Sequence, residues 1–479
     1  MSGEIALGIT HSISGQGWRW RRASNDVGGD GLTPQDLVTQ LLLARGVDPD
    51  DLERHRAPSL RGFMPDPAIF QDMERAATRL ADAVQAREPL TIFGDYDVDG
   101  ATSAALLVRL LRQLGLDPGA YIPDRLMEGY GPSGAALVKL GAAGSRLIVT
   151  VDCGAQAFEA LAEARAAGIE VIVVDHHQCA TTLPDGYAIV NPNRLDEAPE
   201  AAVHGNLAAV GVAFLLGAAL LRVLRARGYF AQREEPDLKR LLDIVALGTV
   251  ADAARLTGFN RALVTQGLKV MARRGNVGLS ALMDASRLTR SPQASDLGFA
   301  LGPRINAGGR VGKSDLGVRL LTTEDAGEAA AIAAELSRLN EERRAIEAGV
   351  LDEALAKGSA TANAAVSIVS GSGWHPGVIG IVAARLKERM GRPAIVIAVD
   401  EAGVGKGSGR SINGVDLGAA VLAAKEHGLL VAGGGHAMAA GLTIDAGKID
   451  ALGEFLNDRL AEAVARATEA RFVGAEKLA

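Results

Sequence analysis

The chain of 479 residues has few cysteines, few aromatic residues, no excess of positive charge and no long apolar run. Two cysteines are too few for the disulfide framework of a secreted domain and fit a reducing cytoplasm. The net charge of −7 argues against a basic protein that coats nucleic acid. No uninterrupted apolar run reaches the roughly 18 residues of a membrane helix, and the N-terminus lacks the pattern of a signal peptide. We therefore expect a cytoplasmic protein with no membrane attachment.

What the chain does contain is typical of a multidomain globular protein. Apolar residues make up 48% of the sequence and charged residues 22%, which excludes a disordered chain. The length predicts two or three domains. The 58 glycines predict many tight turns and close backbone approaches.

From residue 90 onward, short apolar runs alternate with helical patterns. The runs "LTIF" (90–93), "RLIVTV" (146–151) and "IEVIVV" (169–174) have the composition of strands that are buried on both faces. Helical patterns over 101–115 and 157–168 each end at a glycine. This alternation predicts an α/β fold with a doubly wound parallel sheet.

A second region of α/β alternation follows a long helical segment. Residues 324–358 contain no proline and predict a connecting helix on the order of 50 Å long. Beyond it, "AAVSIVSG", "VIGIVAARLKERMG" and "PAIVIAV" predict a second, smaller α/β domain.

The segment "GDYDVDG" places Asp95, Asp97 and Asp99 directly after the first predicted strand. The pattern D-x-D-x-D-G also opens an EF-hand calcium loop. That reading fails because the twelfth position holds Leu106 instead of a glutamate, and because a strand precedes the loop where an EF-hand needs a helix.

Acidic and imidazole side chains follow the other predicted strands as well. Asp152 follows the second strand, and the run Asp175, His176, His177 follows the third, while Asp252 follows a further apolar run. The carboxyl ends of parallel strands meet at one edge of a sheet, so these side chains should converge there. Two carboxylates 4 Å apart repel by roughly 4 kcal/mol at an effective dielectric constant near 20, which protons or metal ions must relieve. Oxygen and imidazole ligands suit Mn²⁺ or Mg²⁺, and a shared aspartate would hold two ions about 3.5–4 Å apart.

The motifs also carry a resemblance to a known family. "GDYDVDGATS", "VDCG", "VDHH" and "LGTVAD" resemble the four successive motifs of the DHH phosphoesterases. The later "GPRINAGGR" and "GGGHAMAAGLT" resemble those of the RecJ single-stranded-DNA-specific exonucleases, and the match covers roughly residues 60–465. The resemblance implies an enzyme with two Mn²⁺ or Mg²⁺ ions that removes mononucleotides from the 5′ end of single-stranded DNA. Such an enzyme would act in DNA repair and recombination.

The resemblance also implies roles for individual residues. The metal-binding positions would be Asp95, Asp97, Asp99, Asp152, His176 and Asp252. Asp97 would lie on one ion, while Asp99, His176 and Asp252 would lie on the other, with Asp152 between them. The catalytic positions would be His177, facing the scissile phosphate, and Asp175. No serine or cysteine nucleophile is required.

Further positions are expected to bind the DNA. Arg125 and Arg310 would hold the 5′-terminal phosphate, because a guanidinium can bind phosphate oxygens with two bonds, and Arg304 is a third candidate. Gly433, Gly434, Gly435 and His436 resemble the substrate-binding motif of the DHH-associated domain, with Arg410 nearby. These glycines would expose backbone N–H groups just before a helix start.

We accordingly expect five regions. They are an N-terminal turn-rich and helical segment packed on the catalytic domain (1–88), the DHH catalytic domain (89–323), the connecting helix (324–358), the DHH-associated domain (359–466) and a tail that could derive from a vector (467–479). A substrate groove too narrow for duplex DNA should lie between the two domains. Bacterial RecJ proteins usually continue into an OB-fold that adds single-strand grip, and we expect this chain to be either a core from which that module has been removed or a family member that lacks it.

Two alternative functions and three partners complete these expectations. A phosphodiesterase of short oligoribonucleotides or cyclic dinucleotides is the first alternative, and a catalytically silent scaffold of a replication or repair complex is the second. The intact motifs favour an active exonuclease over the scaffold. Expected partners are single-stranded DNA, a single-strand-binding protein and a recombination helicase.

Overall fold

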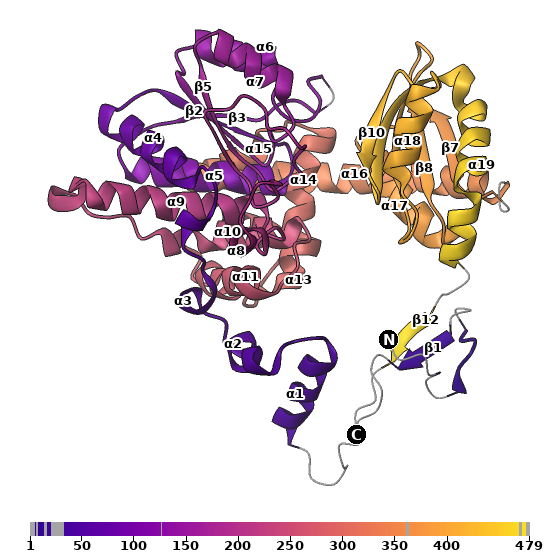
Figure 1. Cartoon of the computed structure of the whole chain (residues 1–479), viewed down its shortest axis with the longest axis horizontal. Coiled ribbons are helices and arrows are strands. Elements are labelled where there is room, and N and C mark those ends of the chain that lie inside the picture. Colours follow the sequence, from indigo (N-terminus) through magenta and orange to yellow (C-terminus); the bar gives the residue numbers. More distant parts are fainter. Residues whose placement is uncertain are drawn as a thin grey trace. The chain divides into compact units, whose positions relative to one another are not determined.

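The computed structural model describes residues 5, 8–13, 17–20, 33–125, 127–360, 364–468 and 472–475. The chain forms two compact units (Figure 1). The parallel-sheet unit comprises residues 54–342, and the mixed-sheet unit comprises residues 1–53 together with 343–479.

The parallel-sheet unit is built on five parallel strands in the order β3-β2-β4-β5-β6. The strands are β2 (Leu90–Gly94), β3 (Gly119–Tyr121), β4 (Leu147–Val151), β5 (Glu170–Val174) and β6 (Ala188–Val190). This sheet confirms the predicted parallel α/β fold. Its register pairs Gly94 with Val151 and Val151 with Val174, so three neighbouring strands end at the same level. The residues that follow these strands therefore begin side by side at one edge of the sheet.

Helices cover both faces of this sheet (Figure 1). On one face, α6 (Gly134–Ala142) and α7 (Phe158–Ala166) pack against strand residues such as Ile148 and Val173. On the other face, the larger core joins strand residues such as Ile92 and Val149 to α4 (Met73–Ala86), α5 (Val98–Gln113), α9 (Ala209–Ala226) and α10 (Leu242–Ala251). Alternate residues of each strand point to opposite faces, and therefore both faces need apolar side chains.

The remaining helices of this unit surround the larger core. They are α3 (Leu60–Phe63), α8 (Pro199–Ala202), α11 (Gly258–Met271), α12 (Val277–Ala285), α13 (Ala294–Asp296), α14 (Gly302–Val311) and α15 (Leu316–Thr322). Helix α9 is long and apolar enough, with a mean hydropathy of 1.9, to cross a membrane, but 72% of it is buried inside the protein. Arg222 and Arg225 interrupt its apolar run, which is why the sequence shows no continuous stretch of that length.

Helix α16 (Ala326–Ala360) confirms the predicted long helix and contains 35 residues, which corresponds to about 50 Å. It begins in the parallel-sheet unit and ends in the mixed-sheet unit. Within the mixed-sheet unit, Glu347 of α16 is buried and forms ion pairs with Arg343, at 2.5 Å, and with Arg385.

The mixed-sheet unit contains five strands in the order β10-β11-β9-β8-β7, of which only β7 and β8 are parallel to each other. The strands are β7 (Ser367–Ser372), β8 (Ala394–Val399), β9 (Val404–Arg410), β10 (Ala432–His436) and β11 (Ala439–Asp445). The helices are α17 (Ile379–Met390), α18 (Leu417–Glu426) and α19 (Ile449–Thr468). The predicted second α/β domain is thereby confirmed.

The N-terminal residues divide between the two units. Helix α1 (Pro34–Ala44) belongs to the mixed-sheet unit, as do β1 (Gly17–Trp20) and β12 (Phe472–Ala475), which pair in parallel. Helix α2 (Leu52–Arg56) lies at the boundary, and residues 54–88 belong to the parallel-sheet unit. The five predicted regions and the groove between the two domains stay predictions.

Candidate metal centre

The first part of the site is the turn between β2 and α5. Asp97 is the N-cap of α5, because its carboxylate accepts hydrogen bonds from Asp99 N at 2.8 Å and Gly100 N at 3.1 Å. A Cβ at Gly100 would lie only 2.4 Å from Asp95 O, so the turn closes only around a glycine. The motif "DYDVDG" therefore forms a tight turn that brings three aspartates close together.

Asp99 is fixed from the opposite side by another helix. Its two carboxylate oxygens accept hydrogen bonds from Ala209 N at 2.6 Å and Val210 N at 3.0 Å, at the start of α9. These N–H groups belong to the first turn, where a helix has no backbone partners of its own. A Cβ at Gly248 of α10 would lie 3.2 Å from Asp99 Oδ1, so α10 approaches Asp99 closely.

Asp152 follows β4 and occupies an unusual backbone position. Its φ of 61° lies in the left-handed region, where Asp and Asn occur more often than most residues. Its amide continues the sheet by donating to Val174 O at 3.0 Å, and Tyr130 Oη donates to its carbonyl at 3.0 Å. Both contacts fix the backbone from which the Asp152 carboxylate extends.

Asp175 follows β5 and orients the second of two adjacent histidines. Its buried carboxylate accepts from Ala155 N at 2.9 Å and lies 2.7 Å from His177 Nδ1. Burial alone would raise the pKa of Asp175, but the hydrogen bond and charge of His177 lower the pKa to about 2. Burial also opposes the charged form of His177, yet Asp175 raises the pKa of His177 to about 9. Tyr130 Oη adds a contact to His177 Nδ1 at 3.2 Å.

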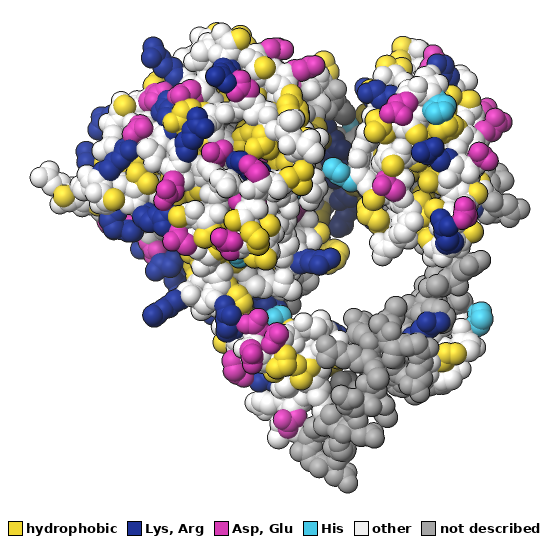
Figure 2. Space-filling view, in the orientation of Figure 1, with side chains coloured by type: hydrophobic (Ala, Val, Ile, Leu, Met, Phe, Trp, Pro, Cys, Tyr) yellow, Lys and Arg dark blue, Asp and Glu magenta, His cyan; other side chains and the backbone are white. Residues whose placement is uncertain are grey.

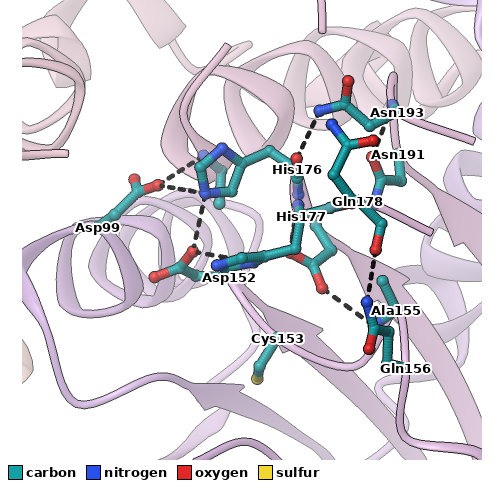
Figure 3. Close-up of polar contacts among 12 residues, drawn as sticks. Asp99, Asp152, Cys153, Ala155, Gln156, His176, His177, Gln178, Asn191 and Asn193 are labelled. Atoms are coloured by element: carbon teal, nitrogen blue, oxygen red, sulfur yellow. Dashed lines mark hydrogen bonds and ion pairs between the residues drawn. The ribbon is translucent and has the colours of Figure 1, made fainter. Parts of the chain in front are cut away.

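His176 lies at the centre of the carboxylates (Figure 3). Its Nε2 lies 3.3 Å from Asp152 Oδ1 and 3.8 Å from Asp99 Oδ2, and its Nδ1 lies 3.9 Å from Asp252 Oδ2. Asp252 is the C-cap of α10, so a helix end completes a site that is otherwise built at strand ends. The predicted convergence of these side chains is therefore present in the structure.

The potential ligand atoms form three groups, and within each group they lie within 4.8 Å of one another. The groups are Asp95 with Asp97 and Asp152, Asp99 with His176 and Asp252, and Asp152 with His176 and His177. Asp152 belongs to the group of Asp95 and Asp97 and also contacts His176, which belongs to the group of Asp99 and Asp252, so Asp152 lies between these two groups.

The electrostatics of the cluster favour a cation. Asp95 Oδ1 is buried and has no hydrogen-bond partner, which is costly for a carboxylate. Burial and neighbouring carboxylates raise the pKa values of Asp95 and Asp152 well above their ordinary range. Burial first, and then like charge, raises the pKa values of Asp99 and Asp252 to about 7. Divalent cations would supply the missing partner and balance the charge, so this donor set fits Mn²⁺ or Mg²⁺.

The cluster opens into a polar pocket of about 390 Å³. Besides the acidic residues, its lining includes Tyr96, Arg125, Tyr130, His177, Asn306 and Arg310. Arg125 lies over the Tyr96 ring, 4.8 Å from the ring centroid. A Cβ at Gly309 would lie 2.6 Å from Tyr96 O, which lets α14 bring Arg310 to the pocket. Arg304 does not line this pocket, because its guanidinium donates to Ala300 O at 2.7 Å and to Ser337 Oγ at 3.2 Å.

The glycine-rich motif of the mixed-sheet unit has a different structure from the one predicted. Gly433, Gly434, Gly435 and His436 lie in β10, an edge strand paired with β11, and no helix starts there. The prediction of a helix start was wrong, because a glycine-rich segment can precede a helix or form a strand. A Cβ at Gly435 would lie 2.3 Å from Ala439 O. Ala439 pairs with both His436 and Arg410, which brings these two residues to the same end of the sheet.

Sequence reasoning missed three residues that hold the site. Tyr130 contacts Asp152 and His177, and it lies between two glycines with positive φ, in the segment "GYG". Asn191 and Asn193 follow β6 and donate to the backbone carbonyls of His177 at 2.8 Å and His176 at 2.5 Å. The segment "IVNPN" has the same pattern of polar residues after an apolar strand, which was the available signal.

Two family models match the chain over the two units. The model of the DHH family, N-terminal domain, matches residues 89–249, and the DHHA1 domain model matches residues 361–462. A parallel sheet with carboxylates and imidazoles at its strand ends, followed by this second domain, defines a metal-dependent phosphoesterase of the DHH class.

Individual relatives narrow the class. The single-stranded-DNA-specific exonuclease RecJ of Salmonella typhimurium is 42% identical over 430 residues, which cover 86% of this chain and 73% of the relative. RecJ of Escherichia coli is 42% identical over 426 residues, covering 86% and 72%. The chain therefore belongs to the RecJ family.

Solved structures agree with this assignment. A crystal structure of exonuclease RecJ bound to manganese has a TM-score of 0.71 at 36% identity, covering 84% of this chain and 98% of that one. RecJ of Thermus thermophilus in complex with Mn²⁺ has a TM-score of 0.74 at 32% identity, covering 94% and 64%.

Proposed function

We propose that this protein is an exonuclease that degrades single-stranded DNA from its 5′ end and uses two Mn²⁺ or Mg²⁺ ions. The observation that carries the proposal is the convergence of carboxylates and imidazoles from β2, β4, β5 and α10 around one polar pocket. The chain spans more than two thirds of the length of RecJ relatives named single-stranded-DNA-specific exonucleases.

The two ions would be held by two of the ligand groups. Asp97 and Asp95 would hold one ion, Asp99, His176 and Asp252 would hold the other, and Asp152 would contact both. When bound, such ions lower the pKa of water and neutralise charge that develops on a phosphate. The turn and helix contacts of Asp97 and Asp99 fix their carboxylates before an ion arrives, which lowers the cost of ordering the site.

His177 would act on the scissile phosphate. Its Nδ1 lies 2.7 Å from Asp175, and its side chain lines the pocket. Because the Asp175 carboxylate contacts Nδ1, Nε2 is the ring nitrogen that can donate a hydrogen bond or a proton to the leaving oxygen. Asp175 would be a positioning residue, because it holds the ring and stays ionised.

Arginines would position the DNA. Arg125 and Arg310 line the same pocket as His177, and a guanidinium can hold a terminal phosphate with two bonds. In the mixed-sheet unit, edge strand β10 has one row of backbone groups outside the sheet, and Arg410 lies in register with its end. We propose that β10 and Arg410 contact the sugar–phosphate backbone of the DNA strand. Binding of DNA by Arg304 stays a prediction.

The surface charge is compatible with an enzyme that binds single-stranded DNA at a local site. Lys and Arg side chains are interspersed with Asp and Glu over the visible face of the parallel-sheet unit (Figure 2). With a net charge of −7, the protein would hold DNA through local contacts, without a basic coat. We propose further that it works in the cytoplasm in DNA repair and recombination, with a single-strand-binding protein and a recombination helicase as partners.

The test is a cleavage assay with Mn²⁺ and three substrates. These are a 5′-phosphorylated single-stranded oligonucleotide, the corresponding duplex and a dinucleotide. We expect mononucleotides from the single strand and little product from the other two. A preference for the dinucleotide would point to a phosphodiesterase of short oligonucleotides, and inactivity on all three would point to a scaffold. Either result would overturn the proposal.

A further inference from the structure

Phe299 is an exposed aromatic residue in a chain that has few of them. It exposes 81% of its surface, whereas Phe93 and Phe214 are buried, and aromatic residues make up only 4% of the sequence. Among the described residues, the other exposed aromatic side chains are Tyr130 and Phe158, at 54% and 37%. A single exposed apolar residue is common on protein surfaces, so its location must decide whether it has a role.

The location is a π-helical turn beside the metal centre. Phe299 lies in η6 (Leu297–Leu301), which continues directly into α14. π-Helical turns are rare and are frequently found at functional sites. A Cβ at Gly298 would lie 3.5 Å from Val250, and a Cβ at Gly302 would lie 3.3 Å from Ala251. The turn therefore packs on the last residues of α10, directly before the metal-site residue Asp252.

The side chain also shares a helix face with residues of the pocket. Asn306 and Arg310 line the pocket and lie seven and eleven residues after Phe299, which are spacings of about two and three helical turns. The π-helical turn has more residues per turn than an α-helix and offsets Phe299 from this face by a fraction of a turn. Along the helix axis, Phe299 lies about 10 Å from Asn306.

We propose that Phe299 is a stacking platform for a base of the single-stranded substrate, next to the nucleotide in the metal centre. The inference rests on the proposed exonuclease function. A strand whose 5′ phosphate lies at Arg310 can pass along the same helix face and reach Phe299. Every base has a flat π-face, so stacking gives affinity without sequence preference. Tyr96 is less suited to this role, because Arg125 already lies over its ring.

The test compares substitutions that separate aromatic from merely apolar character. Phe299→Ala and Phe299→Leu remove the ring, Phe299→Trp keeps one, and Phe158→Ala is a control that removes an exposed aromatic residue of α7 outside the pocket lining. The dissociation constant is measured by fluorescence anisotropy with Mn²⁺ and a 5′-phosphorylated phosphorothioate oligonucleotide, which resists cleavage. A second oligonucleotide carries abasic sites near its 5′ end.

We expect Phe299→Ala and Phe299→Leu to weaken binding by about 5- to 150-fold, the range for loss of one base–aromatic contact. The abasic strand should bind these variants and the wild type equally. Phe299→Trp and Phe158→Ala should bind as the wild type does. Equal binding of the base-bearing strand by wild type and Phe299→Ala would overturn the inference, as would an equal loss for both strands. Cleavage is measured separately on the unmodified oligonucleotide with Mn²⁺. A wild type that binds the phosphorothioate strand but does not cleave the unmodified one overturns the proposed function alone, and one that does neither overturns both.

Discussion

Replacement of Asp152 by asparagine should abolish the stabilisation of the protein by metal ions. Asn is the appropriate substitution because Asp152 has a φ of 61°, which Asn tolerates better than Ala does. Asp152 shares a ligand group with Asp95 and Asp97, and its Oδ1 lies 3.3 Å from His176 Nε2 of the other ion's group, so its loss should affect both ions.

The magnitude follows from the distances in the cluster. Two carboxylate charges 4.8 Å apart, the outer limit of a ligand group, repel by about 3.5 kcal/mol at an effective dielectric constant of about 20. Proton uptake, which the raised pKa values of the cluster favour, relieves part of this repulsion. Without metal, the Asp152→Asn protein should therefore be as stable as the wild type or more stable, by up to about 3 kcal/mol.

With metal bound, the wild type should be more stable than the Asp152→Asn protein. A ligand at 100 times its Kd stabilises the wild type by about 2.7 kcal/mol, which raises the Tm of a unit of this size by about 5–10 °C. Thermal unfolding in EDTA and in Mn²⁺ measures this difference. Asp72→Asn is the matched control, because Asp72 also has a positive φ of 59° but lies outside the ligand groups. A full Mn²⁺-dependent rise in Asp152→Asn would refute the bridging assignment.

Three further predictions concern separate parts of the molecule. Arg310→Ala should raise the KM for 5′-phosphorylated strands and leave the KM for 5′-hydroxyl strands nearly unchanged, as measured by initial rates on both substrates; an equal effect on the two would remove Arg310 from the phosphate site. Gly100→Ala should lower the free energy of unfolding by about 1–3 kcal/mol and abolish most of the activity, because the added Cβ would meet the Asp95 backbone. Gly349→Ala is the control: its Cβ would lie in open space on α16 and should raise the free energy of unfolding by about 0.5–1 kcal/mol, as measured by denaturant titration. Glu347→Gln should destabilise the mixed-sheet unit by about 3–5 kcal/mol in the same titrations, because it removes a buried carboxylate that pairs with both Arg343 and Arg385.

The parallel sheet and the cluster at its edge were predictable because their causes are local. β-Branched runs that lead directly into Asp152 or Asp175 indicate both the buried strand and the position of the polar residue after it. Because β2, β4 and β5 end in register, the polar residues that follow them meet at one edge of the sheet, and this follows from the strand pattern alone.

Other features depend on tertiary contacts that a linear pattern does not contain. Asp99 is oriented by the start of α9, more than 100 residues away, and Tyr130 reaches Asp152 from a loop between two glycines. The glycines of β10 were predicted to precede a helix, but pairing with β11 makes them an edge strand. In each case the deciding partner is distant in sequence.

The central claim is that side chains from β2, β4, β5 and α10 hold two divalent ions in one pocket. Anomalous diffraction from crystals of the protein soaked in Mn²⁺ tests it most directly. The claim predicts two manganese peaks about 3.5–4 Å apart, with Asp152 in contact with both. A single manganese peak at a saturating Mn²⁺ concentration, or two peaks of which neither lies among Asp99, His176 and Asp252, would contradict it.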